Sequence, residues 1–170
     1  MRSIVLWRGA HFLGICPYNS GRLPTNPISR SPRALYAGLC RKLGVSDLRS
    51  DRDLAALVQK RLSPAAIGSL IRSGLSDAEV YNLIVPRRTL AHRIAKHQSL
   101  SKEESDKAVR VARITAAAEQ VFGEPERAWR WLRKPKRQFD SKSPIEMLAS
   151  EAGARLVEEL IIQIDNGMAA

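Results

Sequence analysis

The chain has 170 residues and carries 28 Lys and Arg against 17 Asp and Glu, which gives a formal net charge of +11. This length suits one domain, or two small domains that share a core, and it allows a hydrophobic core without disulfides or a metal. Two cysteines, Cys16 and Cys40, lack CxxC spacing, and no apolar run approaches the ~20 residues of a membrane span, which argues against a zinc site, a disulfide framework and a membrane protein.

The basic residues are unevenly distributed along the chain. Residues 1–52 carry nine Lys and Arg against two acids, residues 80–102 carry five against none, and residues 123–142 carry seven against three. The last 28 residues reverse the balance, with Arg155 alone against five acids. A surplus of this size indicates a polyanionic partner, usually nucleic acid, for the front and middle of the chain. We expect the acidic end to face a different partner.

Residues 1–33 contain no Asp or Glu and include "SGRLPTNPISRSPR", with three prolines and little hydrophobic periodicity. An organellar transit peptide has a similar composition, but we interpret the segment as a disordered tail or an extension from a misassigned start codon. A helical pattern follows it, because Leu35, Leu39 and Leu43 recur at one-turn spacing before a stop at Gly44.

Four further helix starts are marked by capping signals. Ser63-Pro64 places a cap before a proline that fits the first helical turn. Three later serines precede a glutamate by three residues, which is the spacing of a capping box. These pairs are Ser76 with Glu79, Ser101 with Glu104 and Ser143 with Glu146, and helix stops are expected at Gly74, Gly123 and Gly167. Because no segment alternates like a half-buried strand, we predict a nearly all-helical fold.

The segment "GLSDAEVYNLIVPRRTLAHR" fits a helix-turn-helix, in which a support helix and a second, groove-entering helix meet at a tight turn. A capping box opens the support helix, where Val80, Leu83 and Ile84 are expected to face inward. Pro86 suits the first turn of the second helix because its missing N–H would have no partner there anyway. We therefore predict a helix-turn-helix over residues 77–97.

Leu90 and Ile94 stand one turn apart on the second helix and form its expected buried stripe. Basic and polar side chains occupy the rest of the circumference, and arginines near the positive helix N-terminus favour an anion. Arginine also pairs bidentately with guanine, and threonine contacts the thymine methyl group. The candidate DNA-binding residues are Arg87, Arg88, Thr89, His92, Arg93 and Lys96.

The same segment also fits a solvated basic helix without a ligand. Its position after a support helix, the lack of acids over residues 80–102 and the basic net charge favour DNA binding over that alternative. His92 and His97 are five residues apart and do not share a helical face, so we expect no metal pair.

A long core helix is predicted from a capping box near residue 101 to Gly123. Its alanines allow a neighbouring helix to approach closely; we expect packing within the chain, with dimerisation through this face as the alternative. A short helix then begins at Pro125. Trp129 and Leu132 share one of its faces, whereas Trp131 points elsewhere and is a candidate interface residue.

The last predicted helix lies in "ARLVEELIIQID". Its apolar face is formed by Val157, Leu160, Ile161 and Ile164. Ile162 does not belong to that face and projects on the side of Arg155 and Glu158, where an isolated helix would carry a polar residue. A single exposed isoleucine is common on protein surfaces and has no function by itself. Beside an acidic surface, the alternative is that it forms part of a protein-binding patch.

Four blocks of the chain resemble, in order and spacing, the Xre-type antitoxins, a family that includes MbcA and ParS and is paired with RES-domain toxins. The blocks are "GLSDAEVYNLIVPRRTLAHR", "LSKEESDKAVRVARI", "AEQVFGEPERAWRWLRKPKR" and "SPIEMLASEAGARLVEELIIQIDNG". The resemblance covers about residues 74–167 and does not extend to residues 1–33. One departure is Asp140-Ser141, where relatives commonly carry glycines before the "SP" element.

The resemblance implies an all-α protein with an Xre-like helix-turn-helix domain followed by a small helical toxin-binding domain. The chain would then divide into an extension (1–33), a helical region with the helix-turn-helix (34–100) and a long helix with the toxin-binding domain (101–170). The first domain would bind the operator of its own operon, and the second would inhibit a RES toxin that consumes NAD or ADP-ribosylates a target. Homodimers and larger toxin–antitoxin complexes are expected.

Candidate toxin-binding residues come from two sources. The resemblance implies Pro144, Leu148, Gly153, Val157 and Leu160, several of which serve equally well to hold the fold. The helical patterns add Trp131, Arg155, Glu158 and Ile162.

Other functions remain as alternatives. A stand-alone helix-turn-helix transcriptional regulator would share the DNA-binding segment and need no toxin. An enzyme would require a glycine-rich phosphate loop, an HExxH motif, a CxxC pair or a nucleophile elbow, and the sequence contains none of these. A generic RNA-binding protein would require aromatic stacking platforms, which are missing. We therefore predict a cytoplasmic binding protein without catalytic residues, metal or cofactor.

Overall fold

The computed structural model describes residues 32–168, which form helices and turns without a strand. The prediction of an all-helical fold is confirmed for these residues. The predicted extension over residues 1–33 lies outside them, apart from the two residues that open the first helix. The elements are α1 (Pro32–Leu43), α2 (Asp51–Lys60), α3 (Ala65–Arg72), α4 (Asp77–Leu83), α5 (Arg87–Ala95), α6 (Lys102–Phe122), α7 (Pro125–Arg133), the 3₁₀ turn η1 (Arg137–Phe139), α8 (Pro144–Met147) and α9 (Glu151–Asp165).

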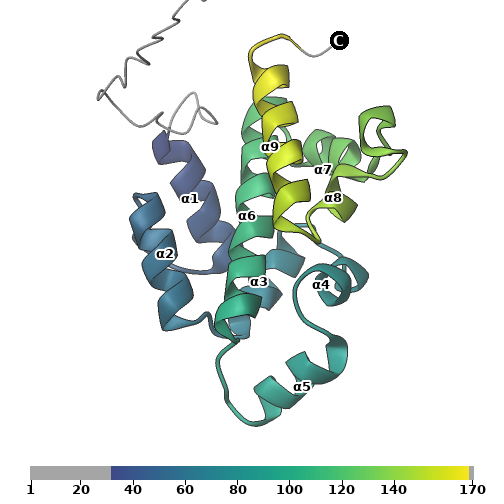
Figure 1. Ribbon diagram of the computed structural model, residues 1–170. Helices are drawn as coiled ribbons and strands as arrows, with labels where there is room; N and C mark the ends of the chain where they lie inside the picture. The colour runs from purple at the N-terminus through teal and green to yellow at the C-terminus, as the bar shows by residue number, and fades with distance from the viewer. Residues whose placement is uncertain (1–31, 169–170) are drawn as a thin grey trace, which may run out of the picture.

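Helix α6 is the axis around which α1, α2, α3, α7 and α9 pack (Figure 1). Small side chains on α6 let its neighbours approach closely. A Cβ added to Gly38 of α1, for example, would stand 3.5 Å from the Cβ of Ala116. The alanine-rich face of α6 is therefore used for packing within the chain, as expected.

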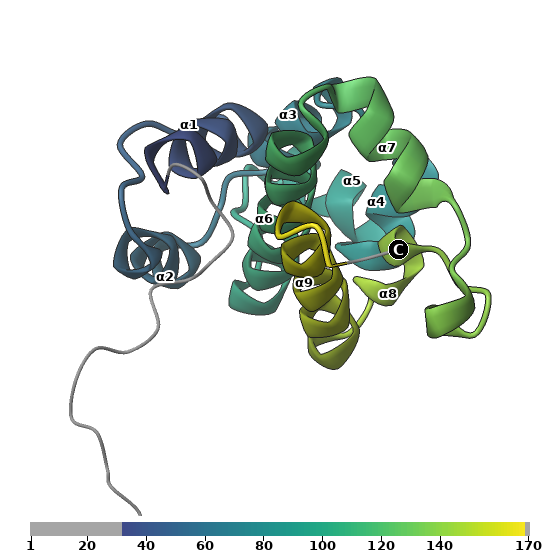
Figure 2. The same cartoon turned by 90° about the horizontal axis from the view of Figure 1, so that it is seen from above.

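The two halves of the chain share one hydrophobic core. It extends from Leu35 in α1 through the interior of α6 to Val157 and Ile161 in α9, both of which are fully buried. Figure 2 shows α1 and α2 on one side of α6, and α4, α5 and α7 on the other. Among the described helices, none is both long enough and apolar enough to cross a membrane.

The three predicted capping boxes and the predicted helix stops are present in the structure, whereas at Ser63-Pro64 the N-cap of α3 is Pro64 and not Ser63. At Ser76 and Ser101 the serine hydroxyl accepts from the amide three residues later, and the glutamate there accepts from the serine amide at 2.7 Å. At Ser143 the amide and the hydroxyl both donate to the Glu146 carboxylate. The stops at Gly44, Gly74, Gly123 and Gly167 all adopt positive φ.

The backbone of the loop before α8 explains why glycine would suit positions 140 and 141. Both residues adopt the left-handed backbone conformation, with φ of 52° and 65°. Glycine enters that region without the steric penalty that a Cβ brings, which is why glycine suits both positions. Here the turn closes through backbone hydrogen bonds, because the Ser141 amide donates to the Lys136 carbonyl and the Lys136 amide donates to the Lys142 carbonyl.

Gly74 ends α3 with a φ of 108°, and Trp129 of α7 lies directly against it. A Cβ at this position would collide with the Nε1 and Cε2 atoms of the indole. The position therefore requires glycine both for its backbone conformation and for the close approach of α7.

Replacing Gly74 with Ala is expected to lower the free energy of unfolding by about 2–4 kcal/mol, because backbone strain and overpacking add. Gly123→Ala is the matched control, since Gly123 also has positive φ but its Cβ would enter open space. That variant should lose only the strain contribution of about 1–2 kcal/mol. Urea unfolding of both variants measures the difference, and equal losses would contradict the packing of Trp129 on Gly74.

Candidate functional site

The helix-turn-helix is formed by α4 and α5, which meet at a short turn. Val80, Leu83 and Ile84 are buried, as predicted, and Val85 is fully buried on the inside of the corner. Pro86 is the N-cap of α5, with a φ of −58°. Its ring therefore stands at the entrance of α5, where no amide donor is required.

Helix α5 makes little apolar contact with the rest of the protein. Leu90 is its one buried residue. The prediction that Ile94 is also buried is wrong, because Ile94 is 55% exposed. The helix projects away from α6 (Figure 1), so that its last turn extends past the core. Ile94 instead lines a hollow with Pro64 and Ala65 at the start of α3.

Most of the predicted DNA-binding side chains on α5 are accessible. Arg87, Arg88, His92 and Lys96 are exposed, and Thr89 is half-buried. Within the described part of the chain, no hydrogen bond or ion pair engages the side chains of Arg87 and Arg88. Both cations are therefore available to an anion at the N-terminus of α5, where the helix dipole favours negative charge.

Arg93 is engaged within the protein. Its Nε lies 2.8 Å from Oε2 of Glu104, and its NH2 donates to Oε1 at 3.1 Å. Its NH1 donates to the Ser99 carbonyl at 3.1 Å. The side chains of Arg93 and Glu104 are only 22% and 13% exposed. Arg93 thus ties α5 to the first turn of α6, and its predicted contact with DNA would have to compete with this ion pair.

A second ion pair joins α7 to the start of α4. Arg133 donates to Glu79 at 2.8 and 2.9 Å and to the Gly74 carbonyl at 2.8 Å. Its guanidinium lies 4.7 Å from the ring centroid of Trp129, whose Nε1 donates to the Ser73 carbonyl. Burial alone would raise the pKa of Glu79, but the hydrogen bonds from Arg133 and from the capping serine outweigh it and lower that pKa. The turn between α3 and α4 is thereby fixed to α7.

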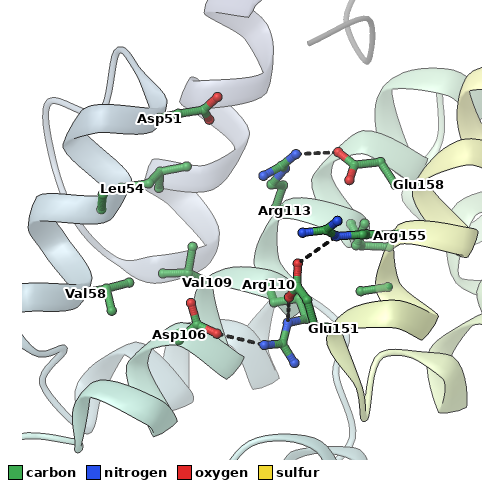
Figure 3. Close-up of a pocket in the computed structure, with 13 residues that line it drawn as sticks. Asp51, Leu54, Val58, Asp106, Val109, Arg110, Arg113, Glu151, Arg155 and Glu158 are labelled. Carbon is green, nitrogen blue, oxygen red and sulfur yellow. Dashed lines mark hydrogen bonds and ion pairs between the residues drawn. The ribbon is translucent and has the colours of Figure 1, made fainter.

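Charged side chains hold α9 on α6 beside a groove between α2, α6 and α9 (Figure 3). Arg113 of α6 pairs with Glu158, and Nε of Arg110 lies 2.9 Å from Oε2 of Glu151. Arg155 also reaches Glu151, at 3.4 Å. Glu158 and Arg155, both predicted to contact a partner protein, therefore already have partners within the chain.

Five of the predicted toxin-binding residues are buried. They are Pro144, Leu148, Gly153, Val157 and Leu160. A Cβ at Gly153 would collide with the Met147 carbonyl, so this glycine lets α9 start close to α8. In this conformation the five buried residues hold α8 and α9 in place within the fold, and their side chains are not accessible to a partner.

Trp131 of α7 is half-buried and packs against the edge of the core. Its ring centroid lies 5.2 Å from that of Phe122, and Nζ of Lys136 lies 5.0 Å from its centroid. Burial lowers the pKa of Lys136, and the charge of Lys134 adds to this effect. Trp131 is therefore a partly exposed aromatic side chain with a lysine beside its ring.

The outer face of α9 carries an apolar side chain that the sequence pattern missed. Leu156 is 48% exposed, beside the exposed Arg155 and Glu159, and Ile162 is partly exposed on the same helix. Leu156 stands directly before the buried Val157 and outside the apolar stripe of α9. Its position off the stripe was the signal that could have found it.

Comparisons with known proteins match both parts of this arrangement. Residues 53–113 match the antitoxin Xre-like helix-turn-helix domain, and residues 117–167 match the antitoxin Xre/MbcA/ParS C-terminal toxin-binding domain. Antitoxin Xre of Pseudomonas putida is 38% identical over 125 residues, which are 74% of this chain and 79% of that relative. The chain belongs to the Xre family of antitoxins. Antitoxin Xre of Yersinia enterocolitica is 31% identical over 85 residues, which are 49% of this chain and 57% of that relative.

The two matches assign a partner to each half of this Xre antitoxin. The helix-turn-helix domain implies DNA, and the toxin-binding domain implies a toxin. Antitoxins of this family are binding proteins and not enzymes. Across residues 32–168, no three His, Cys, Asp or Glu side chains are grouped to hold a metal ion. Helix α6 begins in one matched region and ends in the other, so a single helix joins the two parts.

The substitution Glu104→Gln tests the role of Arg93. Glutamine keeps the capping box but removes the charge that holds Arg93, so DNA affinity should fall roughly 3- to 10-fold as α5 loses its anchor. Fluorescence anisotropy with DNA from the antitoxin's own promoter region measures the change.

Glu103→Gln is the matched control, because Glu103 carries the same charge in the same helical turn but pairs with the partly exposed Lys107. If Arg93 contacts DNA instead, its release from Glu104 would strengthen binding. Tighter DNA binding by Glu104→Gln than by Glu103→Gln would therefore contradict the anchoring role.

Proposed function

We propose that this Xre antitoxin neutralises a RES-domain toxin, an enzyme that consumes NAD or ADP-ribosylates a target, and binds the operator of its own operon. One observation carries the proposal: α6 supports an exposed cationic helix in the region matched to a helix-turn-helix and an exposed helix α9 in the region matched to a toxin-binding domain. The RES class of the toxin rests on the resemblance to Xre antitoxins described above.

In the proposed DNA complex, α5 lies in the major groove of the operator. Arg87 and Arg88 at its start are suited to guanine edges or phosphates, and Thr89 is suited to a thymine methyl group. His92 and Lys96 lie farther along the helix and are proposed to contact the backbone. Arg93 is proposed to contribute by holding α5 against α6.

The proposed toxin contact lies on the outer face of α9. Leu156 and the partly exposed Ile162 are its apolar side chains, and Arg155 lies between them around the helix. Binding energy concentrates on apolar and arginine side chains that a partner can cover. Glu158 contributes through its hold on α6, and Trp131 provides a separate aromatic contact on α7. In this proposal residues 34–100 carry the DNA contacts and residues 101–170 carry the toxin contacts.

We also infer that the antitoxin is a homodimer that assembles with the toxin into a larger complex. Helix-turn-helix proteins read two half-sites about one helical turn apart through twofold symmetry. A single α5 offers few cations, and pairing two copies doubles the contacts with DNA.

A stand-alone transcriptional regulator is the second candidate. The match of residues 117–167 to a toxin-binding domain favours the antitoxin. Deleting residues 143–170 would remove the fully buried Val157 and Ile161 from the core. Point variants on exposed surfaces therefore separate the two functions more cleanly than truncation.

Arg87→Ala or Arg88→Ala is expected to weaken operator binding by about 1–3 kcal/mol where the arginine reads a base, with relaxed specificity at that base pair. A pure phosphate contact would weaken binding to all DNA sequences alike. Titration against the operator and a scrambled duplex distinguishes the two cases. Wild-type affinity for the operator in both variants would overturn α5 as the recognition helix.

Leu156→Asp is expected to weaken toxin binding by about 2 kcal/mol or more, because it replaces an apolar contact of the proposed interface with a charge. Growth of cells that co-express a RES toxin encoded in the same operon, and pull-down of that toxin, provide the readouts. Ile71→Asp on α3 is the matched control, since Ile71 is also exposed, at 37%. Equal neutralisation by both variants would exclude the outer face of α9. If cells that co-express this RES toxin with the wild-type antitoxin fail to grow, the RES toxin is excluded as the antitoxin's partner.

A further inference from the structure

Three arginines surround a hollow where α7 passes the turn between α3 and α4. Arg72 comes from the end of α3, and Arg130 and Arg133 come from α7. Trp129 also lines the hollow, and Glu126 is the one acidic residue in its lining. We call Arg72, Arg130 and Arg133 the seam arginines, because they lie where the toxin-binding domain meets the helix-turn-helix domain.

Two of the seam arginines have no carboxylate partner among residues 32–168. Arg133 pairs with Glu79, whereas NH2 of Arg72 donates to the Ser69 hydroxyl at 2.9 Å. Arg130 makes no hydrogen bond or ion pair within the described residues. Both Arg72 and Arg130 are exposed. Arg133 is offset by Glu79, whereas Arg72 and Arg130 face the single carboxylate of Glu126 in the hollow, and this excess of positive charge attracts an anion.

The contacts of Arg133 place the hollow next to the start of α4. Its guanidinium donates to Glu79 in the first turn of α4 and to the Gly74 carbonyl just before it. In a helix-turn-helix, the support helix crosses the phosphate backbone while the second helix occupies the groove. Figure 2 shows α4, α5 and α7 on the same side of α6, and Figure 1 shows α4 between α7 above it and α5 below it. The first turn of α4 carries two acidic residues, Asp77 and Glu79, and Arg133 offsets the charge of Glu79.

We propose that Arg72 and Arg130 contact phosphates of the operator DNA that flank the sequence read by α5. The inference rests on the proposed DNA binding by α5 and extends the DNA contact into the toxin-binding domain, because Arg130 lies within residues 117–167. Phosphate contacts fix the orientation and strength of binding and carry no sequence information. These two arginines therefore add affinity for any duplex and hold α7 against the DNA.

Arg72→Gln and Arg130→Gln in the full chain test the proposal. Each should weaken binding to the operator and to a scrambled duplex by the same factor, roughly 3- to 10-fold near physiological salt. Each should also reduce the slope of log affinity against log salt concentration by about 1. Arg127→Gln is the matched control, because Arg127 lies on the same helix and pairs with Glu124 at 3.0 Å. Its salt slope should stay at the wild-type value.

If Arg72→Gln and Arg130→Gln both keep the wild-type DNA affinity and salt slope while Arg87→Ala loses DNA affinity, this inference is overturned. The proposed DNA binding by α5 would remain intact. Unchanged affinity in all three variants would overturn the proposed DNA binding itself. If Arg72→Gln and Arg130→Gln weaken toxin neutralisation but leave DNA affinity unchanged, the two arginines contact an acidic surface of the toxin. That result would equally overturn the inference. Thermal unfolding of each variant verifies that replacing an exposed arginine leaves the fold intact.

Discussion

Close packing between small side chains of α6 and its neighbours is the interaction on which the rest of the structure depends. Ala108, Ala112 and the run Ala116–Ala118 are buried, and Gly38 of α1 lies opposite Ala116. Protein interiors are as dense as organic crystals, so larger side chains here would push the helices apart. Because α6 begins in the helix-turn-helix domain and ends in the toxin-binding domain, this packing also fixes the relative orientation of the two domains.

Ion pairs add a second level of organisation by connecting separate helices. Arg93 with Glu104 ties α5 to α6, and Arg133 with Glu79 ties α7 to α4. Lys42 of α1, only 4% exposed, pairs with Glu119 of α6 at 2.6 Å. Removing one member of the largely buried Lys42–Glu119 pair leaves an uncompensated charge, so these two positions tolerate substitution poorly. The cations without such partners are the ones available for DNA.

Much of the fold could be predicted from the sequence because the signals are local. Capping boxes, stop glycines and apolar periodicity each depend on residues within one or two helical turns, and the structure confirms them. The inward residues of α4 were predicted for the same reason. Ile94 was not, because a helical stripe predicts a buried face without showing where the supporting core ends.

The candidate sites were harder to predict because they depend on pairings between distant residues. Glu104 lies 11 residues beyond Arg93, and Glu79 lies 54 residues before Arg133. No helical pattern links either pair, so Arg93 was grouped with the DNA-facing cations and Arg133 was not singled out. Family resemblance identified α8 and α9 as toxin-binding, but it could not separate Leu148 and Val157, which are buried, from Leu156, which is exposed.

We propose that DNA and toxin occupy separate surfaces of this antitoxin, and a titration tests this separation directly. Fluorescently labelled operator DNA saturated with the antitoxin would receive RES toxin up to one toxin per antitoxin, while the mass of the labelled species is followed by sedimentation. One species that contains DNA, antitoxin and toxin together is expected. Release of the DNA as toxin binds, at every ratio up to that point, would contradict separate surfaces.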